Sequence, residues 1–176
     1  MAEDLSSKTE IKKPYPHEIK TRIVGKVSDE VLKDVVDCVK DVFELSGYEG
    51  LPPEIVSISD GSVVLSSGDE IEACYGFDFG DPPIPGRIYV SSEKSKQCFG
   101  STDIPIGVAA GAFAAHEAME HVNHMRGRQL LSSHKKLTAE EHKTDTEDEA
   151  NQIARKVVEA RFGWTVYFGD EQDKKK

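Results

Sequence analysis

The sequence has no long hydrophobic run and no excess of positive charge, and each absence excludes a class of function. No segment approaches the roughly 20 consecutive apolar residues of a membrane-spanning helix, and the start, MAEDLSSKTEIKK, lacks the apolar core of a signal peptide. Lysine and arginine number 22 against 32 acidic residues, so the net charge is −10. DNA, RNA and anionic membranes select a basic face instead. We therefore expect a soluble, cytoplasmic protein with neither a nucleic acid nor a membrane as partner.

Cysteine is also scarce. Cys38, Cys74 and Cys98 are odd in number and show no C-x-x-C spacing, which favours reduced thiols over a disulfide framework. Internal repeats are absent, and the lysine-rich end is the only low-complexity tract. A chain of 176 residues with this composition is expected to form a single compact domain.

Polar composition separates the two ends from the rest of the chain. Residues 1–20 and 170–176 are expected to be flexible, and they flank a single domain over 21–169. Within that domain, apolar residues at helical spacing predict a first helix that Ser28 caps and Gly47 ends.

Proline and glycine then separate short β-prone runs, which predict a small mixed or antiparallel sheet. Asp60-Gly61 between the first two runs is typical of a hairpin turn, and residues 80–86 are typical of a loop. The predicted strands lie at 55–58, 62–65, 73–77 and 87–90.

Two further helices are predicted after a polar stretch at 91–103. The first begins near Pro105 and is rich in alanine and glycine, which allow close packing; a charged connection at 126–143 follows it. The second runs from about Thr146 to Arg161, and residues 163–168 are predicted to add a closing strand. This order of elements indicates an α+β domain.

Residues 116–124 read His-Glu-Ala-Met-Glu-His-Val-Asn-His, and they suggest a metal site. Zinc peptidases carry H-E-x-x-H on a helix, where two imidazoles one turn apart bind zinc and the glutamate is the general base. Here the second histidine comes one residue late, so the motif is H-E-x-x-x-H. At about 100° per residue, Glu120 lies about 40° from His116 and His121 about 140°. Regular geometry therefore favours Glu120 beside His116, whereas His121 reaches it only through a one-residue bulge.

The string His116-Glu117…His121, followed by a helix that opens with Glu147, resembles the gluzincin zinc peptidases. Within that family, dipeptidyl peptidase III carries an H-E-x-x-x-H motif, and the order of elements here is similar to that of the minigluzincins. The resemblance implies a zincin-like domain in which His116, His121 and Glu147 bind zinc. It also implies that Glu117 activates a zinc-bound water that hydrolyses a peptide or protein substrate. The substrate is expected to pair with a strand at 87–90 that lines the cleft.

Glu147 has a neighbour that competes for its role. Thr144-x-x-Glu147 and Thr146-x-x-Glu149 both fit a capping box, so either acid can bond the start of the helix. When the apolar stripe of that helix is taken as inward, Glu147 lies about 50° from its centre and Glu149 about 110°. The phase favours Glu147 as the inward residue. Asn151 stands where the family usually has aspartate, and its oxygen is a candidate acceptor for the second N–H of a ligand imidazole.

Three other interpretations remain open. The i,i+4 pairs Glu117–His121 and Glu120–His124 can stabilise an exposed helix by a few tenths of a kcal/mol without any further function. A catalytically inactive zincin-like binding or regulatory protein is the alternative function, because Glu120 and Asn151 stand where the family has histidine and aspartate. A carboxylate–histidine site for two metals, as in helical bundles, is disfavoured by the β-rich middle of the chain.

Overall fold

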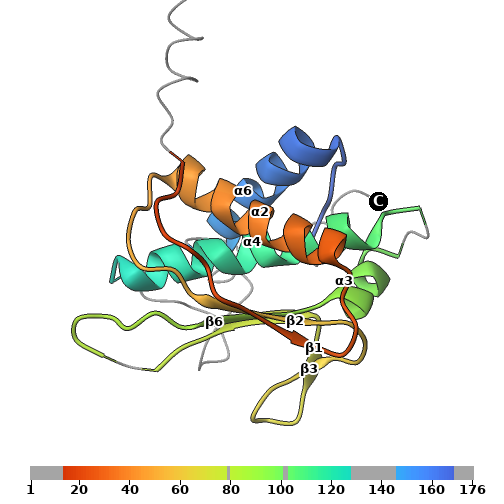
Figure 1. Ribbon diagram of the computed structural model, residues 1–176, viewed down its shortest axis with the longest axis horizontal. Helices are drawn as coiled ribbons and strands as arrows, with labels where there is room; N and C mark the ends of the chain where they lie inside the picture. The colour runs from red at the N-terminus through yellow and green to blue at the C-terminus, as the bar shows by residue number, and fades with distance from the viewer. Residues whose placement is uncertain (1–13, 79, 101–102, 128–145, 169–176) are drawn as a thin grey trace, which may run out of the picture.

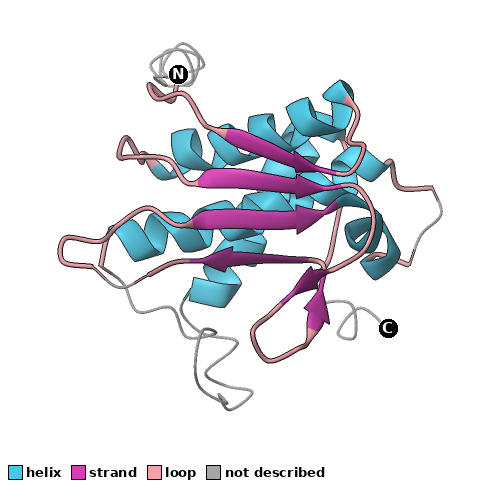
Figure 2. Ribbon diagram, turned by 60° about the horizontal axis from the view of Figure 1, so that its bottom comes forward, coloured by secondary structure: helices cyan, strands magenta, loops and turns pink. Residues whose placement is uncertain are grey.

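The computed structural model describes residues 14–78, 80–100, 103–127 and 146–168. These residues form four helices and a small mixed sheet, and the three longer helices lie on one face of that sheet (Figures 1 and 2). No described helix has the length and apolar content to cross a membrane. In chain order the elements are β1 (Thr21–Val24), α2 (Asp29–Ser46), β2 (Glu54–Ile58), β3 (Val63–Val64), β4 (Glu70–Ile71), β5 (Ala73–Gly76), β6 (Arg87–Ser91), α3 (Ser92–Cys98), α4 (Ile106–Met125) and α6 (Thr146–Phe162).

The main sheet has the strand order β1-β2-β6-β5. Strands β1, β2 and β6 are parallel, whereas β5 is antiparallel to β6. Strand β6, predicted at 87–90, therefore has both edges paired, and it cannot accept a further strand. The expectation that this strand binds an extended substrate is wrong, because β5 is the edge strand on that side of the sheet.

One prediction about strand pairing and one about a closing strand need correction. Gly61 has the left-handed φ of 83° that a turn requires, but β2 and β3 do not pair across it. Strand β2 is already paired on both edges, so β3 pairs with β4 in a separate small ladder. Residues 163–168 form no strand, although Val166 and Phe168 are buried in the core.

Local signals define helix α2 as the sequence indicated. The Ser28 hydroxyl accepts a hydrogen bond from Val31 N at 3.1 Å, and Gly47 ends the helix with a left-handed φ of 71°. The chain before β1 also belongs to the core, since Tyr15 and Ile19 are buried there. Residues 1–13 and 170–176, and the predicted connection from 128 onward, lie outside the described residues.

Helix α4 is central to the fold, because it packs between the sheet and helices α2 and α6 (Figure 1). A Cβ added to Gly107 would overlap the carboxylate of Asp34, and one added to Gly111 would lie 2.7 Å from Cys38 Sγ. Glycine at these two positions permits the close approach of α2 and α4. As a result, nearly every side chain of α4 is buried, including those of the histidine cluster.

Candidate metal centre

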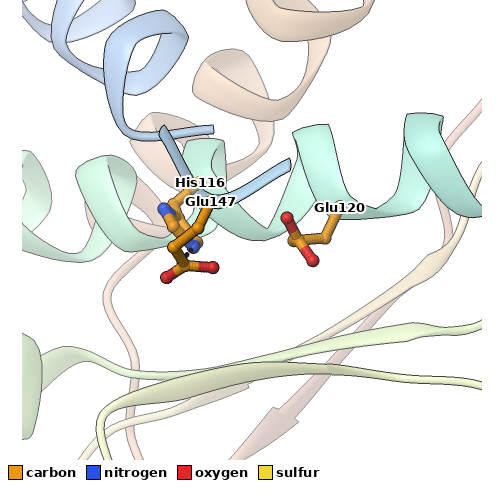
Figure 3. Close-up of side chains that lie close together, drawn as sticks. All are labelled: His116, Glu120 and Glu147. Carbon is orange, nitrogen blue, oxygen red and sulfur yellow. Dashed lines mark ion pairs between the residues drawn. The ribbon is translucent and has the colours of Figure 1, made fainter. Parts of the chain in front are cut away.

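Three side chains from α4 and α6 lie close together: His116 and Glu147 form an ion pair, and Glu120 lies further along α4 (Figure 3). His116 and Glu120 are one turn apart on α4, and Glu147 comes from the first turn of α6. Each offers a ligand atom, and these atoms all lie within 4.8 Å of one another. Helix α4 continues from Ile106 to Met125 without a break, so Glu120 takes the place beside His116 that regular geometry favoured.

The imidazole of His116 is buried in this centre. Its Nε2 lies 3.4 Å from Glu147 Oε1 and 4.0 Å from Glu117 Oε1. Its Nδ1 is buried without a hydrogen-bond partner among the described residues. Burial alone lowers the pKa of His116, but the hydrogen bond to Glu147 and the surrounding carboxylate charges outweigh burial and raise the pKa to about 9. The centre therefore strongly favours a positive charge at this position.

Glu117 lies on the side of α4 that faces strand β5. Its carboxylate accepts a hydrogen bond from the backbone N–H of Tyr75, and its side chain is 13% exposed. Burial is the main cause that raises its pKa to about 7, and the charges of Glu147 and Glu72 add to this effect. His116 and the Tyr75 backbone oppose it. A carboxylate with this pKa can exchange a proton near neutral pH.

His121 is not part of this centre, and the predicted pairing of His116 with His121 is not formed. The ring of His121 is fully buried, with Nε2 2.9 Å from the Leu51 carbonyl oxygen and Nδ1 2.8 Å from Tyr75 Oη. The physical reason is that α4 contains no bulge, so the two histidines keep the wide angular separation of a regular helix.

Glu147 and Glu149 of α6 contact different partners, as their angular positions on the helix predicted. Glu147 contacts His116, whereas Glu149 Oε1 accepts a hydrogen bond from Asn123 Nδ2 at 3.1 Å. Asn151 is buried, but its Oδ1 has no hydrogen-bond partner among the described residues. The predicted hydrogen bond from a ligand imidazole to Asn151 is therefore not formed.

The interpretation of the cluster as a surface feature is wrong. Glu120 is 4% exposed and His124 is 9% exposed, so these side chains belong to the interior and not to a solvated helix end. The two-metal interpretation also gains no support, because the described residues contain a single group with metal-ligand spacing. Tyr75, which contacts both Glu117 and His121, was not among the site residues predicted from the sequence; its only local signal was its position in a β-prone run.

The donors of this centre fit a divalent transition metal. One imidazole nitrogen and two carboxylates are ligands that zinc, iron and manganese all accept in proteins. Tetrahedral ligands about 2.1 Å from an ion lie roughly 3.4 Å apart. The 3.4 Å separation of His116 Nε2 and Glu147 Oε1 matches that spacing. Comparison with known proteins supplies no relative, since no protein-family model, no curated protein and no solved structure matches the chain.

Proposed function

We propose that the protein is a small, zincin-like, metal-dependent peptidase whose metal is bound by His116, Glu120 and Glu147. Glu117 is the general base in this proposal. The observation that carries it is the convergence of the three ligand side chains within 4.8 Å, with Glu117 Oε1 4.0 Å from His116 Nε2. The ligand set differs from the one that the gluzincin resemblance implies, because Glu120 replaces His121. Zinc is the ion that this resemblance suggests.

Each residue has a defined task in this proposal. A bound divalent ion polarises a carbonyl group and lowers the pKa of water. Glu117 accepts a proton from the attacking water and passes it to the leaving amine, which is the usual work of a carboxylate beside a metal. The backbone N–H of Tyr75 holds that carboxylate in place next to His116. Burial of His116 and Glu120 excludes bulk water from one side of the centre.

The sheet edge beside Glu117 is the proposed substrate position. Strand β5 ends the main sheet, and no described strand pairs with its outer edge. An extended peptide can add to such an edge through main-chain hydrogen bonds. Because Glu117 contacts the backbone of β5 at Tyr75, a peptide on this edge would lie beside the general base. Strand β5 thereby takes the role that the resemblance gave to residues 87–90.

A catalytically inactive binding protein of the same architecture is the second candidate. The observation in its favour is that Glu120 stands where the zinc peptidase motif has its second imidazole. An added carboxylate lowers the net charge of the bound ion, which weakens its polarisation of a carbonyl group. Such a protein would bind an extended peptide along β5 without cleaving it.

The test combines metal analysis with peptide cleavage. Purified full-length protein is expected to bind one equivalent of zinc and to cleave members of an unstructured peptide mixture, detected by mass spectrometry. Glu117→Gln should keep the metal and lose cleavage, whereas His116→Ala should lose both. Peptide binding with metal but without cleavage would support the second candidate. If the protein binds none of zinc, manganese and iron, the metal centre is rejected. The ligand set with Glu120 and the set with His121 are then both wrong.

A further inference from the structure

The hydroxyl of Tyr75 joins three groups from two other parts of the chain. It accepts a hydrogen bond from Gly86 N at 2.9 Å, and it lies 2.8 Å from Nδ1 of both His121 and His124. A second centre is the Leu51 carbonyl oxygen, which is 2.5 Å from Tyr48 Oη and 2.9 Å from His121 Nε2. The network therefore connects β5, the residue before β6, helix α4 and the segment between α2 and β2.

The positions of the protons in this network follow from its geometry. A carbonyl oxygen can only accept, so His121 Nε2 carries a hydrogen and donates it to Leu51. His121 is fully buried and contacts no carboxylate in this network, which favours its neutral form and leaves Nδ1 as an acceptor. Tyr75 then donates its single proton to His121. His124 must in turn carry its hydrogen on Nδ1 and donate it to Tyr75.

Strand β5 is attached to α4 at two points through this one residue. The backbone N–H of Tyr75 bonds the carboxylate of Glu117, and the side chain bonds His121 and His124 on the following turns of the same helix. Both histidine rings also pack against the tyrosine ring, with centroids 5.3 Å and 5.6 Å away. The edge strand is thereby held at a fixed distance and register beside Glu117.

We propose that Tyr75, His121 and His124 form a positioning clamp that fixes edge strand β5 against α4 beside the general base. The clamp rests on the proposed function in one respect, namely that the substrate binds along β5. The two histidines are positioning residues and not metal ligands. They explain why the cluster on α4 contains more imidazoles than the metal centre uses.

Gly86 gives independent support for a close-fitting arrangement. A Cβ at this position would overlap the Gly76 carbonyl oxygen and would lie 2.8 Å from Tyr75 Cζ. Because backbone atoms cannot yield as a flexible side chain does, only glycine lets this N–H reach the hydroxyl. The approach of the loop to Tyr75 is thus built into the sequence at a residue outside α4.

The first test is made on the unchanged protein and does not depend on enzymatic activity; variants serve only to assign the signals. Side-chain ¹H–¹⁵N NMR of the intact protein at neutral pH, assigned through single His→Asn variants, distinguishes the two neutral tautomers and the imidazolium. His121 is expected to carry its proton on Nε2, and His124 on Nδ1. If the two rings share one tautomer, or if His121 is an imidazolium, the clamp is wrong.

The second test separates positioning from metal binding. Tyr75→Phe in zinc-loaded protein should increase amide exchange of residues 73–76 on the order of tenfold, because it removes the hydroxyl that joins β5 to α4. Zinc affinity should stay within about twofold, since the ligands are untouched. Tyr89→Phe is the matched control. Tyr89 pairs with Cys74 and points to the opposite face of the sheet from Tyr75, so this variant should leave the amide exchange of residues 73–76 unchanged. Loss of zinc affinity in Tyr75→Phe, or unchanged exchange, would overturn the clamp.

Kinetics then links the clamp to the substrate. For a cleaved peptide, Tyr75→Phe should raise KM roughly tenfold with a smaller change in kcat, because the strand that binds substrate loses its fixed position. A fall in kcat alone would contradict the positioning role. If the tautomers and exchange rates agree with expectation but no peptide is cleaved, the clamp stands and the peptidase proposal fails. If peptides are cleaved and the variant has an unchanged KM, the clamp fails and the peptidase proposal stands.

Discussion

Two groups of histidine side chains lie along one helix, α4, in opposite electrostatic surroundings. His116 faces the carboxylates of Glu117, Glu120 and Glu147, and its pKa is raised. His121 faces tyrosine hydroxyls and a backbone carbonyl, and burial lowers its pKa to about 4. The same residue type is thus favoured as a cation or metal ligand in one group and as a neutral hydrogen-bonding element in the other. The comparison shows that neighbours, and not the motif, decide what each imidazole can do.

The largest expected effect separates the two groups by metal affinity. His116→Ala removes the single nitrogen ligand and should lower zinc affinity by more than the roughly 100-fold that outer-sphere changes can cause. His121→Asn should change zinc affinity by less than about tenfold, since its ring contacts no proposed ligand side chain. Competition titration against a chelator measures both values. Equal losses in the two variants would show that His121 belongs to the metal centre.

The free energy of unfolding should depend on the second group of histidines, His121 and His124. In metal-free protein, His121→Ala removes the acceptor of the buried Tyr75 hydroxyl proton and one of the two donors to the Leu51 carbonyl, which keeps only Tyr48. Unsatisfied buried groups of this kind cost about 1–3 kcal/mol, so the free energy of unfolding should fall by about 2 kcal/mol. Urea denaturation measures this change. His124→Ala, which breaks one bond of the same network, serves as a graded control and should cost less.

Most helices of this fold could be predicted from the sequence, because their signals are local. The Ser28 cap, the Gly47 stop and the apolar spacing define α2 within a few residues. Strand pairing could not be predicted in this way, since the turn at Gly61 gave no information on which strands β2 would meet. Helix α3 was missed because it is short and polar, and β1 because every residue in it is exposed.

In the candidate site, too, local features could be predicted from the sequence and long-range contacts could not. Rotation along a regular helix favoured Glu120 beside His116, whereas the family resemblance implied His121; the structure has Glu120 there, and the geometric argument required no knowledge of the fold. The position of Tyr75 could not be predicted, because it meets His121 across 46 residues of sequence. A contact of that kind depends on which strand forms the sheet edge over α4, and single-sequence periodicity does not report it.

The pH dependence of metal binding should reflect the raised pKa of His116. The pKa is about 9 in metal-free protein, so the metal must displace a proton at pH 7. Zinc affinity should therefore rise by up to about tenfold per pH unit from 7 to 9 and level off above that range. Calorimetry in two buffers of different ionisation enthalpy measures the protons released. A flat profile over this range would contradict a protonated His116.

The stability of metal-free protein should change in the opposite direction over the same range. A folded-state pKa raised above the unfolded value of 6.5 means that the folded state binds the proton more tightly. The contribution of His116 is therefore fully present below pH 6.5 and is lost as pH rises through about 9. Denaturation curves at pH 7 and 9 test this sign. His121, with a lowered pKa, contributes little over this interval, because it is mostly neutral in both states there.

The smallest expected effect defines the boundary of the metal centre. Glu149 lies two residues from Glu147 on α6 and has the same charge, but its carboxylate accepts a hydrogen bond from Asn123 instead of facing His116. Glu149→Gln should change zinc affinity by less than about twofold, whereas Glu147→Gln should lower it as His116→Ala does. The two variants lie on the same helix, are similarly buried and lose the same charge. Their comparison therefore separates direct binding of the ion from long-range electrostatic attraction. If Glu149→Gln weakened zinc as much as Glu147→Gln, net negative charge would govern the affinity, and the defined three-ligand centre would lose its support.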